Sequence, residues 1–131
     1  MYRCEQNLQK STLFFILFVS TILVTRLSIF LIPEVDVTVV GLVIHHFWFG
    51  AILLLCALFI PENHPLRIFF YGVGSGLFAD QLVFMLLGAG NDREYWSLPS
   101  IFGAIVFTVV IFFIRKRFIQ FSLYQLLKRG D

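Results

Sequence analysis

The stretch RIFFYGVGSGLFADQLVFMLLGAG, residues 67 to 90, is almost free of charge over a length that can cross a lipid bilayer. Spanning about 30 Å of hydrocarbon takes roughly 20 residues of helix at about 1.5 Å per residue. The segment from 68 to 90 meets that length, and one acidic residue, Asp80, interrupts it. It predicts a transmembrane helix with a polar group at membrane depth.

The rest of the chain repeats this pattern. Of its 131 residues, 59% are hydrophobic and only 14% are charged, whereas a soluble domain is about a quarter charged and under half apolar. Three further segments approach a span length: 11 to 32, 41 to 60 and 98 to 118. The prolines fall at or between the segment ends, where a missing N–H does no harm. We therefore expect an all-α, integral membrane four-helix bundle that forms a single domain over residues 1 to 131.

Basic residues gather on one side of the predicted spans. Eight of the ten Lys and Arg residues precede the first span, lie between the second and third, or follow the fourth: Arg3, Lys10, Arg67, Arg115, Lys116, Arg117, Lys128 and Arg129. The opposite loops carry Arg93 together with acidic residues. The positive-inside rule then predicts a multi-pass protein of the cell membrane with both termini in the cytoplasm.

The segment FIQFSLYQLLKRGD, residues 118 to 131, mixes apolar residues with Gln and Lys. This composition is typical of an amphipathic helix that lies in the membrane interface, held by buried area and by attraction to anionic lipid. We predict such a helix over about 119 to 129. The net charge of +2 gives no indication of nucleic acid, so the expected partner is the bilayer.

Five strongly polar side chains lie within the predicted spans: Arg26, His45, His46, Asp80 and Gln81. An ionisable group at membrane depth costs roughly 2.5–3.5 kcal/mol on insertion scales, so each should face the bundle interior with a partner. Counted inward along the helices, all of them lie in the outer half of the membrane or near its middle. We expect a polar pocket there that opens toward the outer loop, with candidate ligand-binding residues Arg26, His46, Asp80, Gln81, Asp92, Tyr95 and Trp96.

Helical geometry indicates which of these side chains meet. At about 100° per residue, one face of the third span carries Gly72, Gly76, Ala79, Asp80, Val83 and Leu87. A small-residue face of the second span carries His46, Gly50, Leu53 and Ala57. Small residues let helices approach closely, so we expect His46 rather than His45 to meet Asp80. Gly74, Gln81 and Gly88 form an opposite face, which suits the centre of a bundle or a homo-oligomer contact.

A divalent transition metal is one candidate ligand, because imidazole and carboxylate groups bind such ions. The candidate metal ligands are His45, His46 and Asp80. However, adjacent histidines on a helix point about 100° apart, and neither H-x-x-x-H nor H-E-x-x-H occurs. A structural ion pair between Arg26 and Asp80 accounts for the same residues equally well.

The leading functional prediction is a small polytopic membrane protein whose outer-leaflet pocket binds a metal ion or a small polar or anionic ligand. The alternative is a non-catalytic structural or accessory subunit, whose polar groups only specify helix pairing. A lipid-linked-sugar or ion transporter is a weaker alternative, because the inner half of the spans has few polar residues. No catalytic residue and no reaction are indicated.

Four motifs together resemble small uncharacterised multispan membrane proteins of prokaryotes. They are R-L-x-I from Arg26, H-H-F-W-F-G from His45, G-x-G-x-G-L-F-A-D-Q from Gly72, and Y-W-S from Tyr95. The resemblance covers roughly residues 26 to 100 and implies no known activity. Residues 67 to 90 are also similar to the opening helix of GtrA-type polyprenyl-phosphate-sugar flippases, but here they form the third span, and the two histidines are not part of that pattern.

Overall fold

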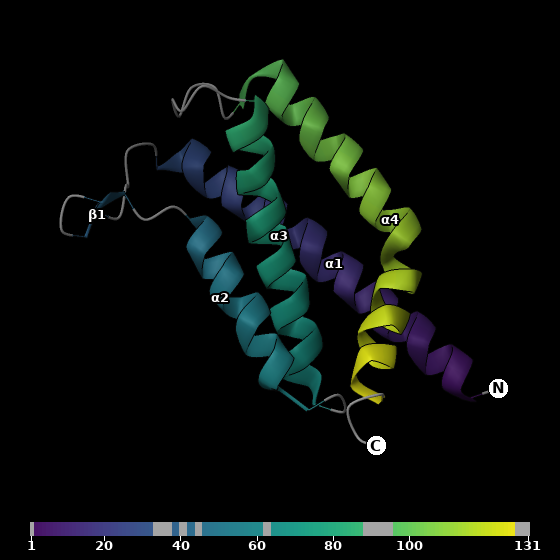
Figure 1. The fold of residues 1–131 in the computed structure, drawn as a ribbon. Coiled ribbons are helices and arrows are strands. Elements are labelled where there is room, and N and C mark those ends of the chain that lie inside the picture. Colours follow the sequence, from purple (N-terminus) through teal and green to yellow (C-terminus); the bar gives the residue numbers. More distant parts are fainter. Residues whose placement is uncertain are drawn as a thin grey trace.

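Four helices carry the fold in the computed structural model, which describes residues 2–32, 38–39, 42–43, 46–61, 64–87 and 96–127. Side chains are described over 8–32, 46–61, 64–86 and 96–117. The helices are α1 (Tyr2–Leu31), α2 (His46–Phe59), α3 (Pro65–Leu87) and α4 (Leu98–Leu127). They alternate in direction, so α1 begins and α4 ends at the same end of the bundle (Figure 1). The predicted all-α class is confirmed.

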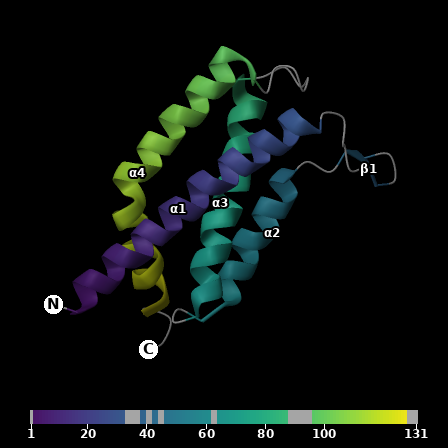
Figure 2. The same ribbon diagram turned by 180° about the vertical axis from the view of Figure 1, so that it is seen from behind.

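Helix α3 is the centre of the arrangement. It packs against α1, α2 and α4, and α1 also packs against α4. Seen from both sides, α1 crosses α3, and α4 begins beside α3, moves away from it along its middle and returns toward it at its C-terminal end (Figures 1 and 2). The α2–α3 side of the bundle is therefore closely paired, while the side formed by α1 and α4 is more open.

Three of the helices contain segments long and apolar enough to cross a membrane. They are Leu8–Leu31, Pro65–Leu86 and Leu98–Arg117, with mean hydropathies of 2.3, 1.4 and 2.2. Large hydrophobic side chains on their outward faces are exposed, for example Leu23 on α1, Met85 on α3 and Phe102 on α4. Because water disfavours so much apolar surface, lipid is the solvent that this surface fits.

The predicted second span, 41 to 60, was wrong as a helix of full membrane length. Helix α2 begins only at His46 and has 14 residues, about 21 Å of helix at about 1.5 Å per residue. Before it, β1 (Thr38–Val39) pairs antiparallel with β2 (Leu42–Val43), with Thr38 opposite Val43. Residues 37 to 44 are rich in Val, Thr and Ile, whose branched side chains favour strands over helices.

Two other helices are longer than the sequence analysis expected. Helix α1 starts at Tyr2 rather than near residue 11, and α4 continues without a break from Leu98 to Leu127. Neither α1 nor residues 104 to 127 contain Gly or Pro, so nothing ends the helix early. A separate helix starting at 119 is therefore not found; those residues continue α4, and their amphipathic face stays a prediction.

Glycines bring α3 close to two neighbours at once. A Cβ atom added at Gly50 of α2 would lie 2.8 Å from both the carbonyl oxygen of Gly74 and the amide nitrogen of Phe78. On the other side, a Cβ at Gly76 would lie 2.9 Å from the carbonyl oxygen of Phe18 in α1. Gly74 thus lets α2 approach α3, and Gly76 lets α1 approach it, as small residues do in membrane helix pairs.

The glycine faces of α3 follow the prediction only in part, because the side that carries Gly72 and Gly76 was expected to meet the small-residue side of the second span. Gly72 and Gly76 face α1, whereas Gly74 faces α2. Gly74 and Gln81 are both buried within the chain, and the predicted homo-oligomer contact through this face stays a prediction. Gly88, the third residue of that predicted face, lies outside the described residues.

The apolar core lies where α1, α3 and α4 meet. Phe18 and Ile22 of α1 pack with Ala79 of α3, and Phe107 and Ile111 of α4 cover them. The ring of Phe18 stacks against that of Phe107, with centroids 6.5 Å apart. Ala79 immediately precedes Asp80 on α3, so this core positions the polar residue that follows it.

Candidate functional site

Arg26 and Asp80 form an ion pair between α1 and α3. The Nε of Arg26 donates a hydrogen bond to Oδ1 of Asp80 at 2.7 Å. The side chain of Arg26 is 8% exposed and that of Asp80 is fully buried. An unpaired charge at this depth is strongly unfavourable, so each side chain compensates the other.

Ser100 adds α4 to the pair. The Nη2 of Arg26 donates to Oγ of Ser100 at 3.2 Å and to its carbonyl oxygen at 3.5 Å. Ser100 lies in the first turn of α4, where the hydroxyl of Ser97 accepts its backbone N–H at 3.4 Å and so caps the helix. Pro99 between them is tolerated because a first-turn residue needs no intrahelical N–H bond.

Sequence reasoning missed Ser100. The signal was the stretch Ser97-Leu98-Pro99-Ser100, which has the serine cap and first-turn proline of a helix start. A hydroxyl in that first turn lies at the same end of the bundle as Arg26. Its full burial and its hydrogen bond with Arg26 show that it belongs with the ion pair of Arg26 and Asp80.

His46 approaches the same carboxylate from α2. Its Nε2 lies 3.8 Å from Oδ2 of Asp80, and its side chain is 24% exposed. That distance is too long for a hydrogen bond, and the contact becomes an ion pair only when the imidazole is protonated. The predicted meeting of His46 with Asp80 is confirmed. Arg26, His46, Asp80 and Ser100, which we call the polar cluster, thus join all four helices.

A cavity of about 560 Å³ adjoins the polar cluster between α1 and α4. Its walls are aliphatic side chains from both helices, among them Ile22 and Leu23 of α1 and Ile105 and Val109 of α4. Among the described residues that line it, Arg26 is the one charged side chain. Trp96 also lines the cavity, and its ring packs edge-on against Phe30 with centroids 5.6 Å apart. Volume and lining are those of a small-molecule pocket, which is mostly apolar with a few placed polar groups.

The structure brings together some of the predicted site residues and not others. Arg26, His46 and Asp80 meet, and Trp96 joins Arg26 at the cavity. Gln81 is buried on the face of α3 that carries Gly74, and the described contacts of the polar cluster do not include it. His45, Asp92 and Tyr95 lie outside the described residues.

The described residues do not form a metal site. No group of three or more His, Cys, Asp and Glu side chains among them is close enough to hold an ion. Of the three predicted ligands, only His46 and Asp80 are described, and Asp80 is already bonded to a guanidinium. Two such side chains fall short of the three or four protein ligands that zinc sites use.

The chain was also compared with known proteins. No family model, no curated protein and no solved structure matches it. The resemblances drawn from its motifs therefore stay predictions, and the polar cluster and the cavity beside it are the features that bear on function.

Proposed function

We propose that this is a membrane protein that binds an amphiphile in the cavity between α1 and α4, with the polar or anionic end of the ligand at Arg26. The observation that carries the proposal is the double position of Arg26, which belongs to the polar cluster and also lines the apolar cavity. The proposed function is the binding of this amphiphile, and it includes no reaction.

The lining of the cavity supports an apolar ligand body. Its aliphatic walls form few hydrogen bonds with a polar molecule, whereas a hydrocarbon chain in the cavity makes van der Waals contacts with them. A guanidinium, a planar group with five N–H donors, can engage more than one acceptor at a time. A phosphate or carboxylate at the end of such a chain is therefore the ligand group that Arg26 suits best.

The other members of the polar cluster would hold Arg26 in place. Asp80 fixes Nε and Ser100 fixes Nη2, so the guanidinium is oriented before any ligand arrives. His46 lies beside the second oxygen of Asp80, and its protonation would add one positive charge to a cluster in which Arg26 and Asp80 cancel. Both termini in the cytoplasm, as the basic residues predict, would place the cavity mouth in the outer leaflet.

Fluorescence quenching tests the proposal, because Trp96 lines the cavity. The chain has two tryptophans, and a Trp48→Phe variant leaves Trp96 as the only one. Lipids with brominated chains quench a nearby indole. We expect a brominated anionic lipid in neutral vesicles to quench Trp96 more strongly than a brominated phosphatidylcholine with the same chains at the same mole fraction.

Two variants in that background locate the quencher. Ala104→Phe places a ring in the cavity wall and should abolish the excess quenching by the anionic lipid, while Leu55→Phe, on the exposed face of α2, should leave it unchanged. Equal quenching by both lipids in the starting protein, or an excess that survives Ala104→Phe, would refute binding in this cavity.

A non-catalytic accessory subunit is the second candidate function. The observation in its favour is that Arg26 and Asp80 satisfy each other at 2.7 Å with almost no exposure, as a purely structural pair would. In that case the cavity would be covered by a helix of another protein. A photoreactive residue at Ile105 separates the two candidates, because it would cross-link to protein rather than to lipid.

A further inference from the structure

A second cation lies at the opposite end of the bundle from the polar cluster. Arg115 follows Leu98 on α4 by about 25 Å at about 1.5 Å per residue, which places it near the other edge of the hydrocarbon layer. Its guanidinium carbon lies 4.3 Å from the ring centre of Phe112 and 5.1 Å from that of Phe15. These rings hold the side chain between α4 and α1.

The described contacts of Arg115 use the face of its guanidinium. Among the residues that the structure describes, no carboxylate pairs with it, and its described contacts are the two aromatic rings. Stacking on a ring uses the face of the guanidinium, whereas the N–H donors lie in its plane and point outward. A partly buried arginine held in this way is oriented to receive a phosphate at its edge.

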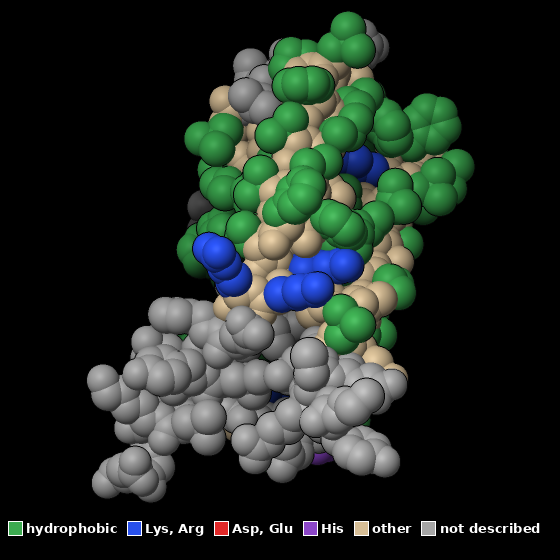
Figure 3. Space-filling view, turned by 90° about the vertical axis from the view of Figure 1, so that its right-hand side faces the viewer, with side chains coloured by type: hydrophobic (Ala, Val, Ile, Leu, Met, Phe, Trp, Pro, Cys, Tyr) green, Lys and Arg blue, Asp and Glu red, His purple; other side chains and the backbone are tan. Residues whose placement is uncertain are grey.

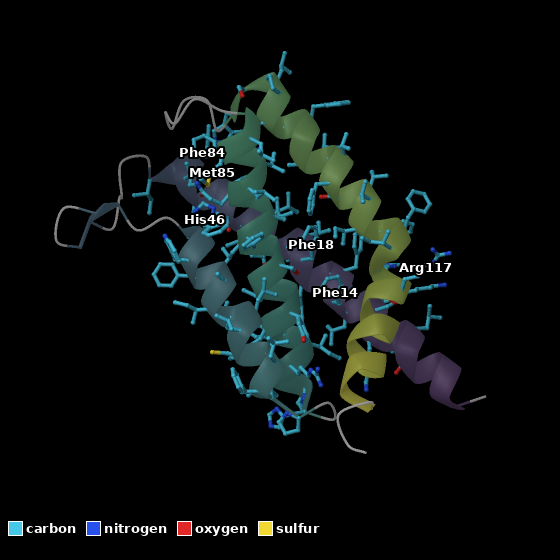
Figure 4. All side chains as sticks on the ribbon, viewed as in Figure 1. Phe14, Phe18, His46, Phe84, Met85 and Arg117 are labelled. Atoms are coloured by element: carbon cyan, nitrogen blue, oxygen red, sulfur yellow. The ribbon has the colours of Figure 1, made fainter. Side chains whose placement is uncertain are left out.

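A cavity of about 130 Å³ begins beside Arg115 and extends between α3 and α4. Its floor is formed by Phe14 and Phe18 of α1, which lie in the space between the other two helices (Figure 4). Apart from Ser75 and Arg115, the side chains that line it are apolar. The cavity is partly open, so a segment of hydrocarbon chain can enter it from the lipid.

The described charged side chains on α1 and α4 toward this end of the bundle carry the same sign of charge as Arg115. Lys116 and Arg117 follow it and are exposed, and Lys10 of α1 is partly exposed. On the face that Figure 3 shows, Lys and Arg side chains gather in a band at the edge of the described surface, and hydrophobic side chains cover much of the described surface beyond it. Such a band attracts anionic lipid to the adjoining leaflet.

We propose that Arg115 and this cavity form a binding site for an anionic phospholipid, with the phosphate at the guanidinium and part of one acyl chain in the cavity. The site is independent of the cavity beside Arg26, since it uses the opposite end of α4. Its ligand is a lipid of the surrounding leaflet, and charge together with an apolar cavity selects it.

The test is a thermal-shift titration of the purified full chain in neutral detergent with phosphatidylglycerol, with phosphatidylcholine of the same chains, and with glycerol phosphate. We expect phosphatidylglycerol alone to raise the melting temperature. Arg115→Gln should remove that rise. Arg117→Gln makes the same chemical change two residues away at a side chain that does not line the cavity, and should keep the rise.

Two further variants separate binding from folding. Arg115→Lys keeps the charge and should retain a reduced rise, and Ser75→Leu, which fills part of the cavity, should weaken the rise while all charges remain. The proposal is overturned if Arg115→Gln and Arg117→Gln respond alike, if phosphatidylcholine stabilises as much as phosphatidylglycerol, or if glycerol phosphate alone suffices. If Arg115→Gln does not fold, the titration of Ser75→Leu tests the proposal instead. A rise in melting temperature as large as that of the starting protein would then overturn the proposed binding site.

Discussion

The α2–α3 interface and the α1–α4 interface are built from different residues and have different capacities. Between α2 and α3, Gly50 and Gly74 meet backbone to backbone, and a single added Cβ atom would clash with main-chain atoms. Between α1 and α4, aromatic rings meet in pairs such as Phe18 with Phe107, and mostly aliphatic side chains line a cavity of about 560 Å³. The difference teaches that small residues bring α2 and α3 into close contact, while larger residues between α1 and α4 leave an open space.

The polar cluster connects the two interfaces, and breaking it should have the largest effect. Asp80→Asn leaves Arg26 buried without its counter-charge, and removal of one partner of a buried pair costs about 3–5 kcal/mol. We expect the free energy of unfolding, measured by denaturant titration in micelles, to fall by that order. Both α1–α3 and α1–α4 contacts should loosen together.

A double variant serves as the control for this change. Arg26→Gln combined with Asp80→Asn removes both charges, so it should be more stable than Asp80→Asn alone. Additive losses in the double variant would mean that the two side chains do not stabilise each other in the folded protein.

At the α2–α3 interface, Gly50→Ala should have the next largest effect on the free energy of unfolding. The new methyl group would lie 2.8 Å from two backbone atoms of α3, which cannot rotate away, so the helices must separate. Overpacking of this kind costs about 1–3 kcal/mol, and the same unfolding titration measures it. Leu55→Phe enlarges an exposed side chain of the same helix and should change stability little; an equal loss in both variants would argue against the close contact.

A matched pair of alanines compares the two interfaces directly. Ala57 is fully buried on the face of α2 that carries Gly50, and Ala104 lines the α1–α4 cavity. Ala57→Phe should cost about 1–3 kcal/mol, whereas Ala104→Phe should cost less because space is present for the ring. If Ala104→Phe lowers the free energy of unfolding more than Ala57→Phe does, the cavity is filled by protein atoms in solution.

The smallest effect on stability is expected from His46→Ala. The imidazole of His46 is 24% exposed, and its Nε2 lies 3.8 Å from Oδ2 of Asp80, beyond hydrogen-bond range. This contact should therefore contribute much less to the free energy of unfolding than the hydrogen bond between Arg26 and Asp80. Partly exposed ion pairs contribute about 1 kcal/mol or less. A loss as large as that of Asp80→Asn would show that His46, not Arg26, is the main partner of the carboxylate.

Much of the fold and part of the site could be read from the sequence, because lipid imposes simple rules on length and charge. The apolar runs gave the helices, and the cost of burying Arg26 and Asp80 in lipid made their pairing expected. The meeting of His46 with Asp80 followed from spacing along α2 and α3.

The remaining features depend on tertiary packing, which the pattern of one segment does not contain. Apolar content alone could not distinguish a full second span from the β1–β2 hairpin followed by a short α2. Nor could helical periodicity tell which neighbour each α3 glycine faces, since Gly72, Gly74 and Gly76 are chemically alike. The cavity beside Arg26 is formed by side chains of both α1 and α4, and no local motif encodes it.

The most direct test of amphiphile binding in the α1–α4 cavity compares the lipids that contact two surface positions. Ile105, at the α1–α4 cavity, and Leu55, on α2, are 56% and 57% exposed, so a photoreactive residue at either has similar access to lipid. After irradiation in mixed vesicles of phosphatidylglycerol and phosphatidylcholine, mass spectrometry identifies each adduct. Enrichment of the anionic lipid at Ile105 over Leu55, lost in Ala104→Phe, is the predicted result. The same lipid composition at both positions, or a protein adduct at Ile105, would contradict amphiphile binding in this cavity.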